Sequence, residues 1–213
     1  YPPIAVINDQ RFLTTLSNRD WRAGIAEAIK VALLKDPEFF DWIYDHVNEL
    51  NNRNLSIMNE LIQRCAKLHA EHITSGDPFE RSSSRPLDFG HWSAHKLEQI
   101  SNFDINHGEA VAIGLLIDCY YAAEIGELAL NEVNRVHKLI KNLGFDEFQP
   151  FLITNSSLNK ELITGLDEFR EHLGGKLTIT LIKAIGLGFE VHTIDSNHLH
   201  AAVMNFQKAS HEI

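Results

Sequence analysis

The chain has 213 residues, with 19 Lys or Arg against 29 Asp or Glu, so its formal net charge is −10 at pH 7. This balance argues against a nucleic-acid groove and a polybasic membrane surface, because both need clustered basic side chains. A hydrophobic share of 44% is typical of a folded globular chain, and two cysteines are too few for a disulfide framework, which favours a reducing, cytoplasmic compartment.

The first residues resemble an internal stretch of a longer protein. The chain begins Tyr1-Pro2-Pro3, without Met and without the basic and apolar regions of a signal peptide. We interpret it as a piece of a longer protein or a processed product. Residues 4–7, IAVI, form a short β-type apolar run with no neighbouring run to pair with. We expect the sheet of this strand to lie in a missing N-terminal part.

From residue 21 onward the apolar residues recur at helical spacing. The first predicted helix covers residues 21–34. The second covers residues 39–50, after Asp36 as N-cap and Pro37 in the first turn. A third helix follows, and then a loop rich in Gly, Pro and Ser. The third helix is predicted over 55–73, the loop over 75–86, and further helices over 89–100, 109–124, 131–142, 148–153, 159–171 and from Asp195 onward.

Residues 109–124 are apolar on almost every side, which predicts a central buried helix. The longest apolar run, residues 110–123, is short for a membrane span and contains Asp118. After a Gly174-Gly175 turn, residues 177–182 are β-branched enough for a strand, although a short buried helix also fits. The sequence therefore predicts a mainly helical domain with minor β structure at its N-terminal edge and near residues 177–182.

Histidines form the densest group of potential metal ligands. His91 and His95 are four residues apart and share a helix face, and His107 stands at the foot of the central helix. Neutral imidazoles suit Zn²⁺, and a carboxylate commonly completes a three-ligand catalytic set. The chain has twelve His and no HExxH motif, so a solvated His pair is the simpler alternative. Glu27 and Lys30 are most simply an ion pair on a helix surface.

Three segments occur together in one order and carry a family resemblance. They are AGIAEAIK at residues 23–30, LDFGHWSAH at 87–95 and HGEAVAIG at 107–114. They resemble the GxAExIK, LNxGHxxGH and HGEAVAIG segments of dehydroquinate synthases. The resemblance implies the sugar phosphate cyclase superfamily and a dehydroquinate synthase-like C-terminal helical domain. Residues 1–20 would be an edge segment of the missing N-terminal NAD-binding domain, and residues 21–213 the helical metal- and substrate-binding domain.

The resemblance also assigns roles to individual residues. Glu27, His91 and His107 match the family's ligands for Zn²⁺ or Co²⁺. Lys30, Glu80 and Asp88 match active-site positions, and His95 matches an imidazole that assists proton transfer from the hydroxyl being oxidised. The residues that match the stretch near the adenosine end of NAD⁺ are Phe12, Leu13, Thr14, Thr15 and Asp20.

Departures from the family pattern bear on the substrate. Dehydroquinate synthases oxidise an alcohol with NAD⁺, eliminate phosphate, reduce the ketone and close a carbocycle by an aldol step. They hold the substrate carboxylate with a Lys and an Arg, where this chain has Ala70 and Ser84, and they have an Asn where Asp88 stands. A substrate without a carboxylate fits better. Residues 76–80, 85–92 and 168–175 resemble the 2-epi-5-epi-valiolone synthase branch, which cyclises sedoheptulose 7-phosphate.

Two alternatives to this cyclase stay open at the level of the sequence. One is 3-dehydroquinate synthase proper, and the other is a non-catalytic helical assembly module that keeps the fold without the chemistry. A metal-dependent phosphohydrolase fits less well, because no adjacent His-Asp pair is present. The resemblance implies a carbon-oxygen lyase that acts on a sugar phosphate, and this fragment alone is expected to be inactive because it lacks the NAD-binding half. It also implies a homodimer.

Overall fold

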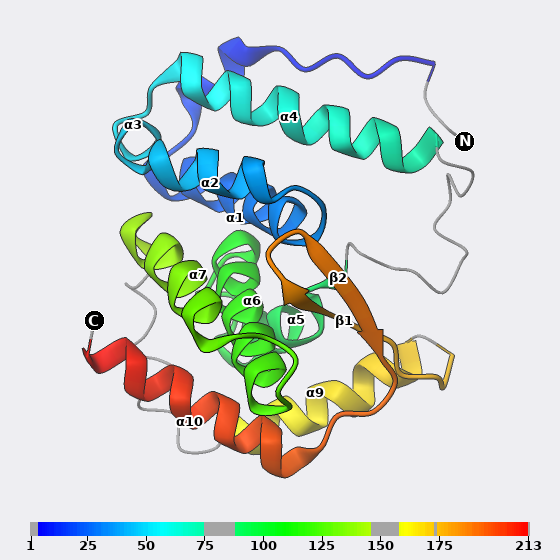
Figure 1. Cartoon of the computed structure of the whole chain (residues 1–213). Helices are drawn as coiled ribbons and strands as arrows, with labels where there is room; N and C mark the ends of the chain where they lie inside the picture. The colour runs from blue at the N-terminus through cyan, green and yellow to red at the C-terminus, as the bar shows by residue number, and fades with distance from the viewer. Residues whose placement is uncertain (1–3, 75–87, 146–157, 173, 213) are drawn as a thin grey trace.

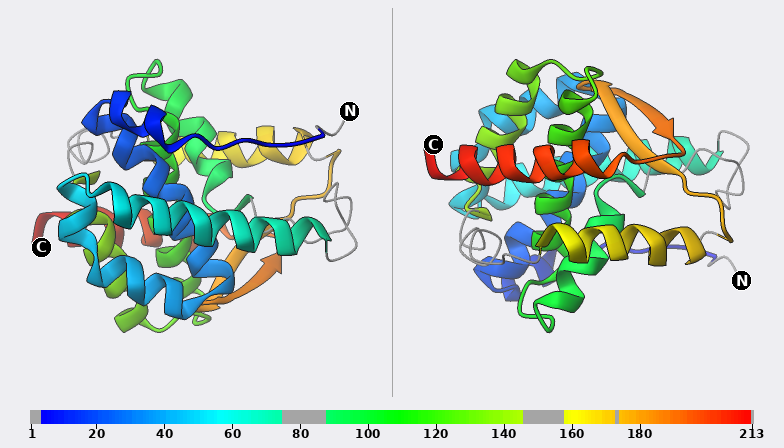
Figure 2. Two further views of the ribbon diagram at one scale, coloured as in Figure 1. Left: turned by 90° about the horizontal axis from the view of Figure 1, so that it is seen from above. Right: turned by 90° about the horizontal axis from the view of Figure 1, so that it is seen from below.

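The computed structural model describes residues 4–74, 88–145, 158–172 and 174–212. Helices surround one central helix, α6, and a two-stranded hairpin lies against one side of the bundle (Figures 1 and 2). The elements are η1 (Gln10–Thr15), α1 (Asn18–Lys35), α2 (Pro37–Asp45), α3 (Val47–Asn51), α4 (Leu55–Thr74), α5 (His91–Ile100), α6 (His107–Glu124), α7 (Leu130–Asn142), α9 (Leu158–His172), β1 (Ile179–Ala184), β2 (Leu187–Val191) and α10 (Ser196–Glu212). The prediction of a mainly helical domain is confirmed.

Helix α6 is the centre of the core, as its all-round apolar sequence predicts. Every residue from Gly108 to Ala122 is buried, and α6 packs against α1, α5, α7, α10 and β1. The helix begins at His107, two residues earlier than the apolar pattern indicates. A capping box explains the earlier start: the Asn106 side chain accepts the Glu109 N–H, and the Glu109 carboxylate accepts the Asn106 N–H.

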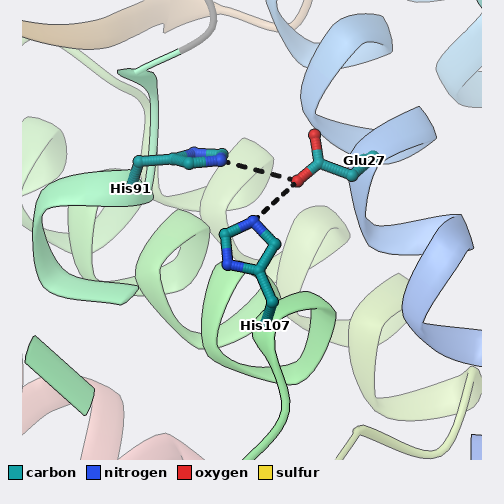
Figure 3. Close-up of side chains that lie close together, drawn as sticks. All are labelled: Glu27, His91 and His107. Atoms are coloured by element: carbon teal, nitrogen blue, oxygen red, sulfur yellow. Dashed lines mark ion pairs between the residues drawn. The ribbon is translucent and has the colours of Figure 1, made fainter. Parts of the chain in front are cut away.

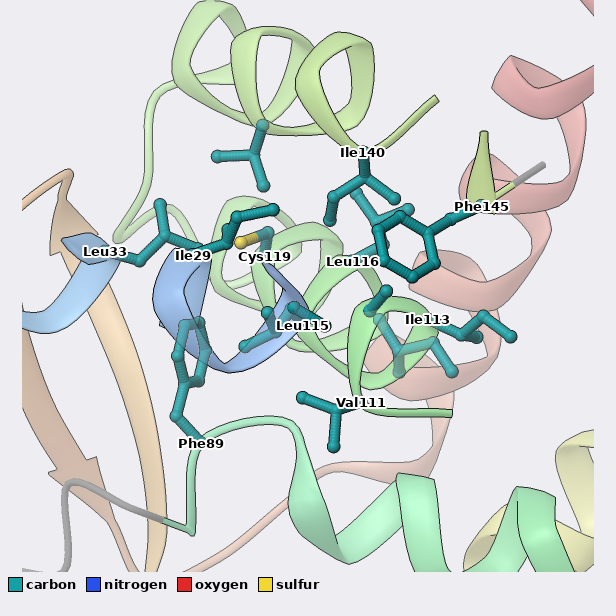
Figure 4. Packing of buried hydrophobic residues seen from close by; sticks show 14 of the residues in the cluster. Ile29, Leu33, Phe89, Val111, Ile113, Leu115, Leu116, Cys119, Ile140 and Phe145 are labelled. Carbon is teal, nitrogen blue, oxygen red and sulfur yellow. The ribbon is translucent and has the colours of Figure 1, made fainter. Parts of the chain in front are cut away.

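The apolar core is formed where α1, α6 and α7 meet. Ile29 and Leu33 of α1 face Leu115 and Cys119 of α6, and Ile140 of α7 closes the cluster from the other side (Figure 4). All five side chains are almost completely excluded from solvent. Cys119 contributes to this packing as a small apolar group, and both cysteines are free thiols.

Two glycines let α6 approach its neighbours closely. A Cβ on Gly108 would lie 2.3 Å from the carbonyl oxygen of Ala23 in α1. A Cβ on Gly114 would meet the carbonyl oxygen of Gly90, directly before α5. Any larger residue at either position would push the helices apart. The spacing of α1, α5 and α6 is therefore set by residues without side chains.

The C-terminal hairpin contains one predicted strand and one that the sequence does not reveal. The strand predicted over 177–182 is present as β1, so the alternative of a short buried helix is wrong. It pairs antiparallel with β2, with Ile179 opposite Val191 and Leu181 opposite Phe189. Gly188 and the exposed Leu187 weaken the apolar alternation of β2, so its pattern is not recognisable. The N–H of Gly186 donates to the Leu33 carbonyl, which fastens the turn to α1.

One prediction about regular structure is wrong, and another stays a prediction. Residues 4–7 form no strand within the described residues, where no strand lies beside them and Ile4, Val6 and Ile7 are exposed, so their pairing with a sheet outside this chain stays a prediction. The helix predicted over 39–50 is divided at His46 into α2 and α3. His46 Nδ1 lies 2.8 Å from the Trp42 carbonyl, and its ring stacks on Trp42, which stabilises a non-helical backbone there.

Several expectations lie outside the described residues. They are the polar loop at 75–86, including Glu80 and Ser84, and the helix at 148–153. Among the residues that the structure does describe, none of the helices combines the length and the apolar character needed to cross a bilayer.

The close approach at Gly114 gives a test of the fold. Gly114→Ala should lower the free energy of unfolding by about 1–3 kcal/mol, because its methyl group has no room against Gly90. Gly24→Ala on α1 is the matched control: nothing lies within 4 Å of its Cβ position, so a gain of up to about 1 kcal/mol is expected. Urea unfolding followed by circular dichroism measures both. Equal stability of the two variants would contradict the close-packing argument.

Candidate metal centre

Three predicted ligands from distant parts of the chain meet at one point. Glu27 Oε1 lies 3.5 Å from His91 Nε2 and 3.6 Å from His107 Nε2 (Figure 3). One ligand atom from each residue lies within 4.8 Å of the others. Two atoms bound about 2.1 Å from one tetrahedral ion would lie about 3.4 Å apart. The observed separations therefore match the space that a single ion requires.

Helix positions explain how the three side chains reach each other. Glu27 lies in the middle of α1, whereas His91 and His107 are the first residues of α5 and α6. Gly90 adopts a positive φ of 76°, which turns the chain sharply into α5 and brings His91 toward α1. The Gly108 contact with Ala23 brings the start of α6 to the same place.

The electrostatic state of the site fits a cation. Glu27 Oε1 is buried, and among the described residues it has no hydrogen-bond partner, which is costly unless another group compensates it. His91 Nδ1 lies 3.1 Å from the Phe89 carbonyl, so Nδ1 carries the proton and Nε2 presents its lone pair to Glu27. Burial, and then the charge of Lys30, lower the pKa of His91 to about 4. A neutral imidazole and a buried carboxylate oxygen suit Zn²⁺ or Co²⁺.

Lys30 and His95 flank the three residues. Lys30 Nζ lies 2.6 Å from Glu27 Oε2, so the ion pair expected from their spacing is present and leaves Oε1 facing the imidazoles. The Lys30 side chain is almost fully buried, unlike that of a surface pair. The His95 ring lies 5.8 Å from the rings of both His91 and His107.

The remaining predicted site residues are not part of this three-residue cluster, and one of them lies outside the described residues. Asp88 is half-buried in the turn before α5, and Glu80 lies outside the described residues. Asp20 lies about two helical turns before Glu27 on α1, and its carboxylate accepts a hydrogen bond from Ser17.

Four of the residues assigned to NAD⁺, Phe12, Leu13, Thr14 and Thr15, lie in the short helix η1. Thr14 and Thr15 donate their hydroxyls to carbonyls within η1, Phe12 is exposed, and the Leu13 carbonyl accepts a hydrogen bond from Arg53. Arg53 thus fastens η1 to the turn between α3 and α4. The role of these residues in NAD⁺ binding stays a prediction.

A buried carboxylate that no sequence motif assigned to the site supports His91. Asp118 of α6 is 1% exposed, and it accepts hydrogen bonds from the Gly90 N–H at 2.8 Å and from Trp92 Nε1 at 2.7 Å. These donors lie on either side of His91. Asp118 therefore holds the turn that positions this imidazole. Asp118 is the single charged residue of the apolar run 110–123, and this was the available signal, because such a group needs partners when buried.

Another missed residue is Glu98 of α5. Its carboxylate lies near both His95 and His107, and the three form a second cluster of potential ligand atoms. Its spacing of three residues from His95 was visible in the sequence, but its proximity to His107 depends on how α5 and α6 pack.

Comparison with known proteins agrees with this geometry. The family model "3-dehydroquinate synthase C-terminal" matches residues 24–163. The 3-dehydroquinate synthase of Nitrosospira multiformis is 35% identical over 87% of this chain and 50% of its own length. The chain thus spans about half the length of the curated relatives it matches.

Two solved structures share the fold of this chain. ValA, the 2-epi-5-epi-valiolone synthase of Streptomyces hygroscopicus, was solved with NAD⁺ and Zn²⁺ bound; it is 25% identical, with a TM-score of 0.83 over 94% of this chain and 55% of its own. A 2-deoxy-scyllo-inosose synthase complexed with carbaglucose-6-phosphate, NAD⁺ and Co²⁺ shares the fold, with a TM-score of 0.76 and 22% identity over 96% of this chain and 56% of its own.

The Asp118 carboxyl predicts a pH dependence of stability. Burial raises its pKa from 3.8 to about 7, so between these values the folded chain binds more protons than the unfolded chain, and stability falls as the pH rises. From pH 5 to pH 8 this group should lower the free energy of unfolding by about 3 kcal/mol. Asp118→Asn has no titrating carboxyl at this position. Between pH 5 and pH 8 its free energy of unfolding should therefore fall by about 3 kcal/mol less than that of the wild-type chain.

Urea unfolding of the wild-type chain and of Asp118→Asn at both pH values measures the difference. Subtracting the two pH dependences removes the contribution of other titrating groups. Parallel pH dependences in the two proteins would mean that Asp118 is ionised throughout.

Proposed function

This chain belongs to the 3-dehydroquinate synthase family and matches the C-terminal domain of that family. From this membership we propose that the chain is the metal- and substrate-binding part of an NAD- and metal-dependent sugar phosphate cyclase. One observation carries the proposal: the buried Glu27 Oε1, which accepts no hydrogen bond from any described residue, faces the Nε2 atoms of His91 and His107 at 3.5 and 3.6 Å. Three ligands with an open position are typical of catalytic rather than structural zinc sites.

The residues of this chain divide the work of such a site. When bound, a divalent ion acts as a Lewis acid toward substrate oxygens, and NAD⁺ carries the oxidation and reduction. Glu27, His91 and His107 would hold the ion, and Lys30 orients the Glu27 carboxylate through Oε2. The half-exposed His95 imidazole lies beside the ligand rings, where it can take the proton from a hydroxyl being oxidised.

The substrate that we propose is a heptulose 7-phosphate, specifically sedoheptulose 7-phosphate. The support is the replacement of the family's carboxylate-binding Lys and Arg by Ala70 and Ser84. Ala70 is exposed on α4 and offers no charge for a carboxylate. The similarity to ValA favours the same branch. In contrast, the curated relatives named 3-dehydroquinate synthase favour the alternative substrate, which carries a carboxylate.

The NAD-binding part of the site would come from a longer protein. The chain covers about half of its relatives, so we propose that an N-terminal NAD-binding domain completes the cyclase, with residues 1–20 at the junction. Without that domain the chain would bind metal but turn over no substrate. A non-catalytic module would bind no metal, and metal content therefore separates the two functions.

Metal analysis tests the ligand assignment. After loading with Zn²⁺ or Co²⁺ and dialysis, the wild-type chain should retain about one equivalent. Glu27→Ala and His107→Ala should each lose it, because two remaining ligands hold such an ion weakly. His200→Ala removes an exposed imidazole from α10 and is the matched control, which should keep the metal. Retention of metal by both ligand variants, with unchanged circular dichroism, would refute the assignment.

Phosphate release tests the substrate. The complete protein with NAD⁺ and metal should release phosphate from sedoheptulose 7-phosphate, with kcat/KM at least about 100-fold above that for the carboxylated seven-carbon substrate of the shikimate route, since the latter would lack a cationic partner. The double variant Ala70→Lys with Ser84→Arg should narrow this ratio. Release from the carboxylated substrate alone would make the protein a 3-dehydroquinate synthase.

A further inference from the structure

One carboxylate lies between two imidazoles that belong to different helices. Glu98 Oε2 is 3.1 Å from His95 Nδ1, and Glu98 Oε1 is 3.4 Å from His107 Nδ1. His95 and Glu98 lie one turn apart on α5, whereas His107 begins α6. The Glu98 side chain is only 16% exposed, so water competes weakly for its oxygens. Each oxygen therefore lies within ion-pairing distance of the Nδ1 atom of a different imidazole, and the contact with His95 is also a hydrogen bond.

This arrangement favours a proton on the Nδ1 atom of each ring. A neutral imidazole has one N–H and one lone pair, and a carboxylate accepts hydrogen bonds but donates none. With the proton on Nδ1 facing Glu98, the lone pair of His107 lies on Nε2, the atom that is 3.6 Å from Glu27 Oε1. In His95, Nε2 is likewise the nitrogen left for a substrate, and this side chain is 55% exposed.

We propose that Glu98 is a positioning residue that fixes the tautomer and orientation of both His107, toward the metal, and His95, toward the substrate hydroxyl. The inference rests on the proposed function, because it takes His107 as a ligand and His95 as the proton acceptor. A carboxylate behind a metal-binding imidazole increases ligand basicity, and its loss typically costs 10–100-fold in metal affinity or activity. Here one carboxylate would serve a ligand and a base together.

The same three residues could instead hold a second ion, and the geometry argues against this. The 3.1 Å contact between His95 Nδ1 and Glu98 is a hydrogen bond, which would have to break before either atom could bind a metal. His107 would also need to bind one ion through each nitrogen, and a neutral imidazole has only one lone pair. A second ion is therefore an outcome that the experiment must exclude.

Glu98→Gln tests the inference, since the amide keeps the shape of the side chain but offers one acceptor and one donor in place of two acceptors. Glu98→Asp keeps the negative charge on a side chain that is one methylene shorter. It therefore separates the effect of the charge from the effect of the distance to the imidazoles. Gln99→Ala, an exposed change on the same helix, is the control. Circular dichroism confirms that each variant is folded.

The first measurement uses the metal-free 213-residue chain labelled with ¹⁵N-histidine. Two-bond ¹H–¹⁵N correlation spectra should show His95 and His107 as Nδ1–H tautomers in the wild-type chain and in Gln99→Ala. Glu98→Gln should shift at least one of the two rings toward Nε2–H. Unchanged tautomers in Glu98→Gln would overturn the inference, whether or not the chain binds metal.

The second measurement is the affinity for Zn²⁺ and Co²⁺ in competition with a chromophoric chelator. Glu98→Gln should bind about 10–100-fold more weakly than the wild-type chain, with Glu98→Asp between them. Equal affinity would overturn the inference and leave the proposed function intact. Absence of binding by the wild-type chain would overturn the proposed function, while the spectra still decide the role of Glu98. Two equivalents of bound metal in the wild-type chain and one in Glu98→Gln would overturn the inference and indicate that Glu98 belongs to a second metal site.

Discussion

The close approach of α6 to α1 and α5 is the constraint on which the candidate site depends. Gly108 lies against Ala23, and Gly114 lies against Gly90, so that backbone meets backbone at both contacts. Glu27 lies one turn beyond the first contact, and His91 directly follows the second. Since packed interiors tolerate little change in volume, these contacts fix the distances between the ligands more firmly than any flexible side chain could.

Each carboxylate around the site has a different task, and its surroundings explain why. Glu27 divides its two oxygens between Lys30 and the imidazoles, which leaves one oxygen for a cation. Asp118 is buried and accepts a hydrogen bond from the backbone N–H of Gly90, next to His91. Glu98 lies between helices, behind two rings. Buried polar groups are costly unless they are satisfied, and Asp118 and Glu98 are each satisfied by groups on or beside a proposed site residue.

The sequence predicted most helices because apolar periodicity and capping residues are local signals. It predicted the meeting of Glu27, His91 and His107 only through resemblance to a family, since spacing alone cannot bring residues from three helices together. Strand β2 was missed because its glycine and exposed leucine interrupt the alternation. The role of His46 in dividing α2 from α3, and the contact of Glu98 with His107, depend on tertiary packing and have no local pattern.

The proposed ligands come from positions 27, 91 and 107, so a bound ion would tie three distant segments into closed loops. An ion of this kind acts as a reversible cross-link: α1 could not separate from α5 or α6 without breaking a coordination bond. Binding only to the native arrangement stabilises it by mass action. The cellular supply of the metal would then control how long the folded domain survives.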